Sequence, residues 1–152
     1  MELTLVRHAP AHDGADDAAR ALTPKGRARF ERCVETMDQL GVRFDRVLHS
    51  PKVRAVETAE LLLPLCDGEL EETRLLTKAP KEPMLALLKS DRLALVGHEP
   101  WLTSLLAWLV VGDVRRADAF ELKKGAVARL EGEPSPGHMR LVALWTPKLL
   151  RR

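Results

Sequence analysis

The stretch LTLVRHAPA, residues 3–11, decides how the rest of the chain can fold. Leu3 to Val6 form an apolar run that favours a β-strand, and the run ends directly in the polar pair Arg7-His8. In an open α/β sheet, ligands bind at the carboxyl ends of the strands. An arginine and a histidine at the end of a first strand therefore indicate a ligand site at that edge of the sheet.

Two further stretches share this design, a strand followed by polar residues and a helix. In VLHSPKVRAVETAELL, residues 47–62, Arg54 lies near the start of the helical segment. In LALVGHEPWLTSLL, residues 93–106, His98 follows the strand, and the glycine before it permits a close approach of the backbone. Each feature is common by itself, but their conjunction at three strand ends predicts one site made of Arg7, His8, Arg54 and His98.

Strands and helices alternate along the first two thirds of the chain, which favours an α/β sandwich. Thr23-Pro24 and Ser50-Pro51 are typical helix starts, a capping residue followed by proline. We predict a single domain over residues 1–152, a three-layer α/β/α sandwich with a central mixed, mostly parallel sheet. The predicted strands cover 2–7, 46–49, 71–76, 92–97, 119–122, 126–130 and 140–145, and the predicted helices cover 24–40, 51–63, 84–88 and 100–110.

Composition argues against several classes of protein. Of the 152 residues, 45% are hydrophobic and 30% charged, and the net charge of +2 is too small to favour nucleic-acid binding. The most apolar segment, 101–111, is shorter than the roughly 20 residues that span a bilayer, so no membrane contact is expected. Cys33 and Cys66 lack zinc-type spacing, and we expect free thiols in a cytoplasmic protein that begins without a secretory signal.

The four strand-end residues suit phosphoryl transfer, which needs positioning and charge neutralisation more than covalent work. A neutral imidazole is a nucleophile when one ring nitrogen is fixed by a backbone carbonyl, and His8 is the candidate. Arg7 and Arg54 can offer forked donors to phosphate oxygens. His98, when protonated, adds a third cationic donor.

Together with ALTPKGRARF, residues 21–30, and the ending FELKKGAVARL, residues 120–130, these motifs resemble the histidine phosphatase superfamily, also called phosphoglycerate mutase-like. Within it the chain is most similar to the SixA-type phosphohistidine phosphatases. The resemblance implies that His8 becomes phosphorylated, that Arg7, Arg54 and His98 bind the phosphoryl group, and that water then hydrolyses the phosphoenzyme. It implies no metal and no organic cofactor.

The sequence shows no convincing counterpart of the acid that protonates the leaving oxygen in larger members of this family. Imidazole is a good leaving group because its conjugate acid has a pKa of about 6.5, whereas an alkoxide must be protonated as it leaves. This favours a phosphohistidine substrate on a signalling or phosphotransfer protein. Further substrate-binding candidates are Ser50, His49 and Glu99.

Other functions remain open at this stage. A small-molecule phosphomonoesterase of the same superfamily would act on a phosphate ester, and a non-catalytic module would only bind phosphate. The loop that carries His12, Asp13, Asp16 and Asp17 could reach over the site or hold a metal, although ligands bunched in one loop rarely build a closed metal site.

Overall fold

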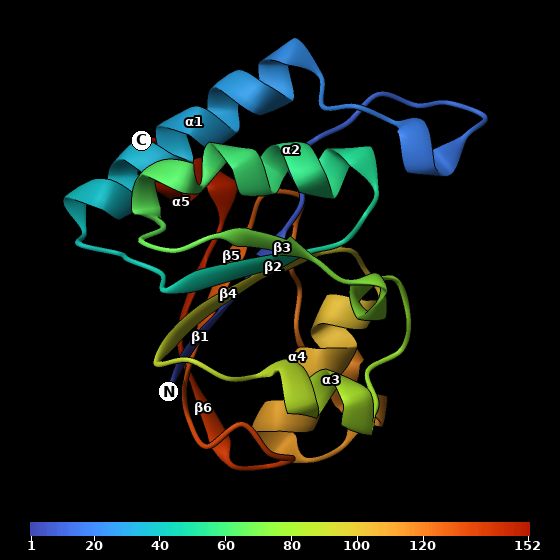
Figure 1. Ribbon diagram of the computed structural model, residues 1–152, viewed down its shortest axis with the longest axis vertical. Helices are drawn as coiled ribbons and strands as arrows, with labels where there is room; N and C mark the ends of the chain where they lie inside the picture. Colours follow the sequence, from blue (N-terminus) through green and yellow to red (C-terminus); the bar gives the residue numbers. More distant parts are fainter.

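The computed structural model describes residues 1–152 and is built on one six-stranded sheet (Figure 1). The strand order is β3-β2-β4-β1-β5-β6. Strands β1 to β4 pair in parallel, β5 runs antiparallel to β1, and β6 runs antiparallel to β5. The predicted mixed, mostly parallel sheet is therefore confirmed. The strands are β1 (Glu2–Arg7), β2 (Arg46–His49), β3 (Leu70–Glu72), β4 (Arg92–Gly97), β5 (Val127–Gly132) and β6 (Met139–Trp145).

Helices cover both faces of the sheet, which confirms the predicted three layers (Figure 1). On one face lie α1 (Pro24–Gln39), α2 (Val53–Leu61) and α5 (Pro147–Leu150), and on the other lie α3 (Glu82–Leu87) and α4 (Trp101–Val111). Side chains of a strand alternate between the faces, so β1 gives Val6 to the first core, and Leu3 and Leu5 to the second. No helix is long and apolar enough to cross a membrane. Both cysteines are free thiols, as expected.

The start of α2 differs from the prediction that Ser50-Pro51 caps this helix. The helix begins at Val53, because Lys52 is still extended with φ −66° and ψ 136°. The Ser50 hydroxyl accepts a hydrogen bond from the Lys52 amide and also contacts His98, so it organises a turn before the helix. Thr23, by contrast, caps α1 as predicted, because its side chain accepts from the Gly26 amide.

One predicted strand is wrong in part, and another is wrong altogether. The run 71–76 is a strand only over β3, after which Thr73 caps a 3-10 turn at Arg74–Thr77. The run 119–122 is not a strand: Arg7 holds Leu122 at the end of β1, and β1 already pairs with β4 on one side and with β5 on the other. A 3-10 helix, Val114–Ala119, precedes this extended segment instead.

The sheet brings three motifs to one edge. Strands β2, β4 and β1 are neighbours that run in the same direction, with His49 opposite Val96 and Arg7 opposite Gly97. Their carboxyl ends therefore meet, and the His8 amide donates to the Gly97 carbonyl at 3.1 Å.

Candidate active site

His8 lies just beyond β1 and is buried, with 5% of its surface exposed. Its Nδ1 donates to the Ala9 carbonyl at 2.8 Å, and because a carbonyl only accepts, Nδ1 must carry the proton. Nε2 therefore keeps its lone pair; it makes no hydrogen bond and is not among the fully enclosed unpartnered atoms. Burial, together with the charges of Arg54, Arg7 and Lys124, lowers the pKa of His8 to about 4 even though the Ala9 bond opposes this. At neutral pH the ring is an uncharged base with a free nitrogen, as a nucleophile requires.

His98 lies beside His8 at the end of β4. The centroids of the two rings are 5.2 Å apart and their planes are tilted by 48°. Nε2 of His98 contacts the Ser50 hydroxyl at 2.7 Å, whereas Nδ1 is buried without a partner. Burial and the neighbouring positive charges lower the pKa of His98 to about 3. A bound anion would reverse this effect, because a negative charge nearby favours the protonated imidazole.

Arg7 and Arg54 each leave a donor unused. Arg7 donates from Nη1 to the Leu122 carbonyl at 3.0 Å, which fixes the guanidinium against the segment after the 3-10 helix. Arg54, in the first turn of α2, donates from Nη1 to the Asp17 carbonyl at 2.7 Å. The Nε atoms of both arginines are buried without partners. Together with His98 Nδ1 they are the only buried side-chain nitrogens or oxygens in the chain that lack a hydrogen bond.

Unpartnered buried donors are costly, so a folded protein keeps them where a ligand completes them. All three belong to the residues that the strand-end motifs predicted. Two arginines with free donors and a protonatable histidine with a free ring nitrogen, grouped around a histidine with a free lone pair, form an arrangement that can bind a phosphoryl group for attack by nitrogen.

The acidic loop between β1 and α1 reaches this site through Asp17. One oxygen of its carboxylate contacts Lys52 Nζ at 2.7 Å and Arg54 Nη2 at 3.3 Å, and the other contacts Arg20 at 3.2 Å. The hydrogen bond from Lys52, with those from Arg20 and Arg54, holds the pKa of Asp17 far below its ordinary value. The loop thus orients Arg54, and Asp17 stays ionised. No group of three or more His, Cys, Asp or Glu side chains is arranged to hold a metal ion, in this loop or elsewhere.

Comparison with known proteins agrees with this geometry. The family described as histidine phosphatase superfamily (branch 1) matches residues 3–78, which contain Arg7, His8 and Arg54. An uncharacterised protein of Picosynechococcus is 32% identical to the chain over 99% of the length of both. The chain belongs to the histidine phosphatase superfamily. By sequence it is a phosphatase of that superfamily.

Two further similarities bear on the fold and on part of the sequence. The structure of the protein histidine phosphatase SixA complexed with tungstate has a TM-score of 0.81, with 23% identity over 97% of this chain and 98% of that one. The human mitochondrial serine/threonine-protein phosphatase PGAM5 is 37% identical over 82 residues. That match covers 52% of this chain and only 28% of PGAM5.

The remaining substrate-binding candidates lie in different settings. Ser50 contacts His98 directly. His49 is buried and donates from Nδ1 to the Ser50 carbonyl at 2.9 Å, and it makes no hydrogen bond to His8, His98 or Arg54. Glu99 accepts bonds from the amide and the hydroxyl of Thr103 at 3.0 and 2.7 Å, so its carboxylate orders the start of α4. A direct role for His49 or Glu99 in substrate binding stays a prediction.

The structure places three residues at the site that were not predicted from the sequence. Thr58 accepts from the Ala9 amide and donates to the Arg54 carbonyl, and so connects β1 to α2. The charges of Lys124 and Lys52 lie close enough to lower the pKa of His8 and of His98, respectively. Lys52 adjoins the Ser50-Pro51 motif, and Thr58 belongs to the Arg54 motif, but their contacts depend on loop paths that no spacing reveals.

Proposed function

We propose that the chain is a cofactor-independent phosphatase that removes phosphate from phosphohistidine on a signalling or phosphotransfer protein, through a phosphorylated intermediate on His8. The observation that carries this proposal is the set of three buried, unpartnered nitrogens: Arg7 Nε and Arg54 Nε, which are donors, and His98 Nδ1, which is a donor once the ring is protonated. They stand beside a histidine whose only hydrogen-bonded ring nitrogen is Nδ1.

The reaction proceeds in two displacements. In the first, His8 Nε2 attacks phosphorus, the bond from phosphorus to the substrate nitrogen breaks, and the substrate ring, which solvent has protonated on its other nitrogen, departs with the electron pair as neutral imidazole. In the second, water attacks the phosphorus, the bond to Nε2 breaks, and inorganic phosphate leaves. Arg7, Arg54 and protonated His98 neutralise the phosphoryl oxygens in both steps.

The lack of a placed acid supports phosphohistidine over alkyl phosphates. Asp17 is held ionised by its basic partners, and both oxygens of Glu99 accept hydrogen bonds from Thr103. Neither carboxyl group is therefore set to protonate a leaving group. An imidazole leaves without such help, because its conjugate acid has a pKa of about 6.5, whereas an alkoxide does not. The fold shared with the protein histidine phosphatase SixA is consistent with this choice.

The experiment is to incubate the protein with a phosphohistidine peptide, quench at alkaline pH, and map the phosphorylated residue by mass spectrometry. We expect phosphate on His8, none in a folded His8→Ala variant, and unchanged labelling in His138→Ala, an exposed histidine far along the chain. Tungstate should inhibit wild type. Labelling of another residue would refute the proposed nucleophile. Faster turnover of alkyl phosphates would identify a phosphomonoesterase, and tungstate binding without any phosphoenzyme would identify a phosphate-binding module.

A further inference from the structure

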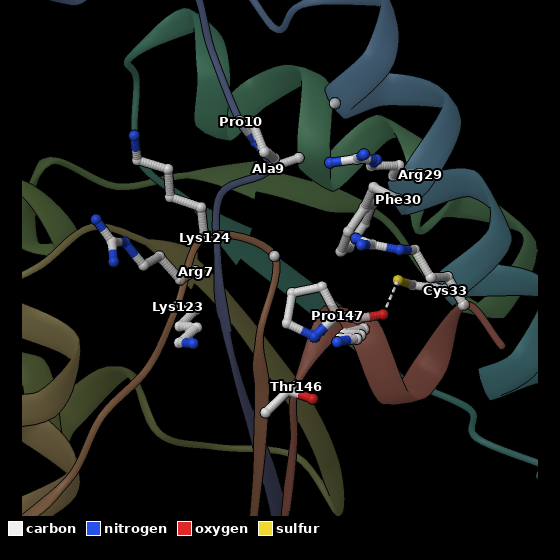
Figure 2. A pocket seen from close by; sticks show the side chains of 14 residues that line it. Arg7, Ala9, Pro10, Arg29, Phe30, Cys33, Lys123, Lys124, Thr146 and Pro147 are labelled. Carbon is white, nitrogen blue, oxygen red and sulfur yellow. Dashed lines mark hydrogen bonds between the residues drawn. The ribbon is translucent and has the colours of Figure 1, made fainter.

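A cavity of about 440 Å³ opens next to the phosphoryl site, between α1, the loop before β5, and the end of β6 (Figure 2). Arg29, Phe30 and Cys33 reach it from α1, while Arg7, Lys123 and Lys124 lie across from them (Figure 2). Its apolar lining residues include Ala9, Pro10, Phe30 and Pro147. A volume of this size accommodates one or two side chains of a partner or a small organic molecule.

The charged side chains that line this cavity are all basic. Six of its fourteen lining residues are cationic and none is acidic; the cations are Arg7, Arg29, Lys123, Lys124, Lys148 and Arg151. None of the six forms an ion pair, although ten other lysines and arginines of the chain are paired with carboxylates. Elsewhere, then, the protein neutralises many of its cations with its own acids, and here it leaves them uncompensated. Such a concave basic surface concentrates anions.

The cavity is joined to the phosphoryl site through shared residues. Arg7 lines the cavity and has a free buried donor at the site. Ala9 lines the cavity and also holds Nδ1 of His8. Lys124 lines the cavity, and its charge contributes to the lowered pKa of His8. A substrate whose phosphoryl group faces His8 therefore has its neighbouring atoms beside the cavity.

The exposure of the lysines indicates what kind of substrate enters. Lys123, Lys124 and Lys148 are exposed at the rim, where a protein surface can reach them, whereas Arg29 is half-buried. Phe30 is the only aromatic lining residue, so the cavity has no pair of rings to sandwich a nucleobase. Carboxylates match both the forks of the arginines and the point charges of the lysines.

We propose that this cavity binds acidic side chains that lie next to the phosphohistidine on the protein substrate, an inference that rests on the proposed function. The enzyme would thus select its partners by two anionic features, the phosphoryl group at His8 and one or more carboxylates beside it. Because the rim is exposed to solvent, this selection weakens as salt increases.

Two peptides test the inference, one with glutamates flanking the histidine and one with glutamines at the same positions. In the first arm, the unphosphorylated peptides are titrated calorimetrically into the His8→Ala protein at low salt. We expect the acidic peptide to bind and the neutral peptide to bind much more weakly. Adding Arg29→Gln or Lys148→Gln should weaken the acidic peptide roughly fivefold for each cation removed. Lys89→Gln makes the same charge change before β4, at the opposite end of the sheet, and should leave binding intact.

In the second arm, kcat/KM is measured for both phosphorylated peptides with wild type and the three variants at native His8. We expect the cavity variants to lose activity on the acidic peptide and to keep it on the neutral peptide. Equal binding of the two peptides, or equal loss in Lys89→Gln, would overturn the inference. If the acidic peptide binds as expected while neither phosphopeptide is hydrolysed, the cavity inference stands and the proposed reaction fails, so the two failures are distinguishable.

Discussion

Thr58 is a single side chain that holds two parts of the active site together. It is fully buried on α2. Its hydroxyl accepts from the Ala9 amide at 3.0 Å and donates to the Arg54 carbonyl at 2.7 Å. Because the Ala9 carbonyl in turn fixes the ring of His8, this hydroxyl acts on the nucleophile through one intervening residue. Thr58 is therefore a positioning residue.

Replacing Thr58 with valine keeps the shape and removes the hydroxyl. The Ala9 amide then remains buried without an acceptor, which we expect to lower the free energy of unfolding by about 1–3 kcal/mol. The ring of His8 loses its fixed support, so we expect kcat to fall roughly tenfold or more with little change in KM. The measurements are denaturant unfolding and steady-state kinetics. Thr58→Ser restores the hydroxyl and should recover kcat; equal kcat in the valine and serine variants would contradict the positioning role.

Three of the four residues that were predicted at this site lie at the end of a strand or directly after it, and Arg54 lies in the first turn of α2. Strand ends in a parallel sheet meet whatever the connecting loops do, so Arg7, His8 and His98 could be placed together from local patterns. Asp17, by contrast, contacts Arg54 although the two residues are 37 positions apart in the sequence. Its contact depends on how that loop folds back, and local pattern carries no information about that path.

Gly26 sets the distance between α1 and the loop after β1. A Cβ built at this position would lie 2.3 Å from the Pro10 carbonyl oxygen and 2.9 Å from the Thr23 hydroxyl. The helix therefore approaches the backbone of the β1 loop more closely than any other residue allows. The motif ALTPKGRARF contains this glycine, but only the packing of α1 against Pro10 explains why it is needed there.

Gly26→Ala should push α1 away from the loop that carries His8. Although alanine favours helix more than glycine does, the overlap with rigid backbone dominates, and we expect the free energy of unfolding to fall by about 1–3 kcal/mol. Thermal or denaturant unfolding gives the measurement. Gly14→Ala is the matched control, because its nearest contact is a flexible Arg20 carbon at 3.5 Å, and it should change stability by less than about 0.5 kcal/mol. If Gly26→Ala were as stable as wild type, the loop at Pro10 would be able to move aside, which would contradict the predicted overlap with rigid backbone.

The strands that were predicted well are those whose limits follow from their own residues and the turns beside them. Apolar β-favouring runs bounded by clear turns gave β1, β2 and β4 their observed limits. The run 119–122 has the same local character but no free strand beside it, since β1 is paired on both sides. Whether an extended segment becomes a strand is decided by the whole sheet, which is why this element could not be predicted from its own residues.

Across the whole molecule, folding keeps two imidazoles neutral among positive charges. Burial, together with nearby positive charges, lowers the pKa of His8 to about 4 and that of His98 to about 3. In the unfolded chain both groups titrate near about 6.5. At a pH between the folded and the unfolded pKa values, the two histidines are protonated in the unfolded chain and neutral in the folded protein. Stability from these histidines is therefore fully present above about pH 6.5 and is lost as the pH falls toward 4.

His8→Ala should remove one of these two contributions. We expect the free energy of unfolding of wild type to fall relative to this variant by about 1.4 kcal/mol for each pH unit below about 6.5, or roughly 2 kcal/mol by pH 5. Urea unfolding from pH 7.5 to 5 gives the measurement, in buffers free of phosphate, because an anion at the site would stabilise protonated His98 and mask the effect. Removing His98 as well should flatten the dependence further. If the free energy of unfolding of wild type and of His8→Ala changed equally with pH, His8 would have the same pKa in the folded protein as in the unfolded chain. That result would contradict a nucleophile that its cationic surroundings keep neutral.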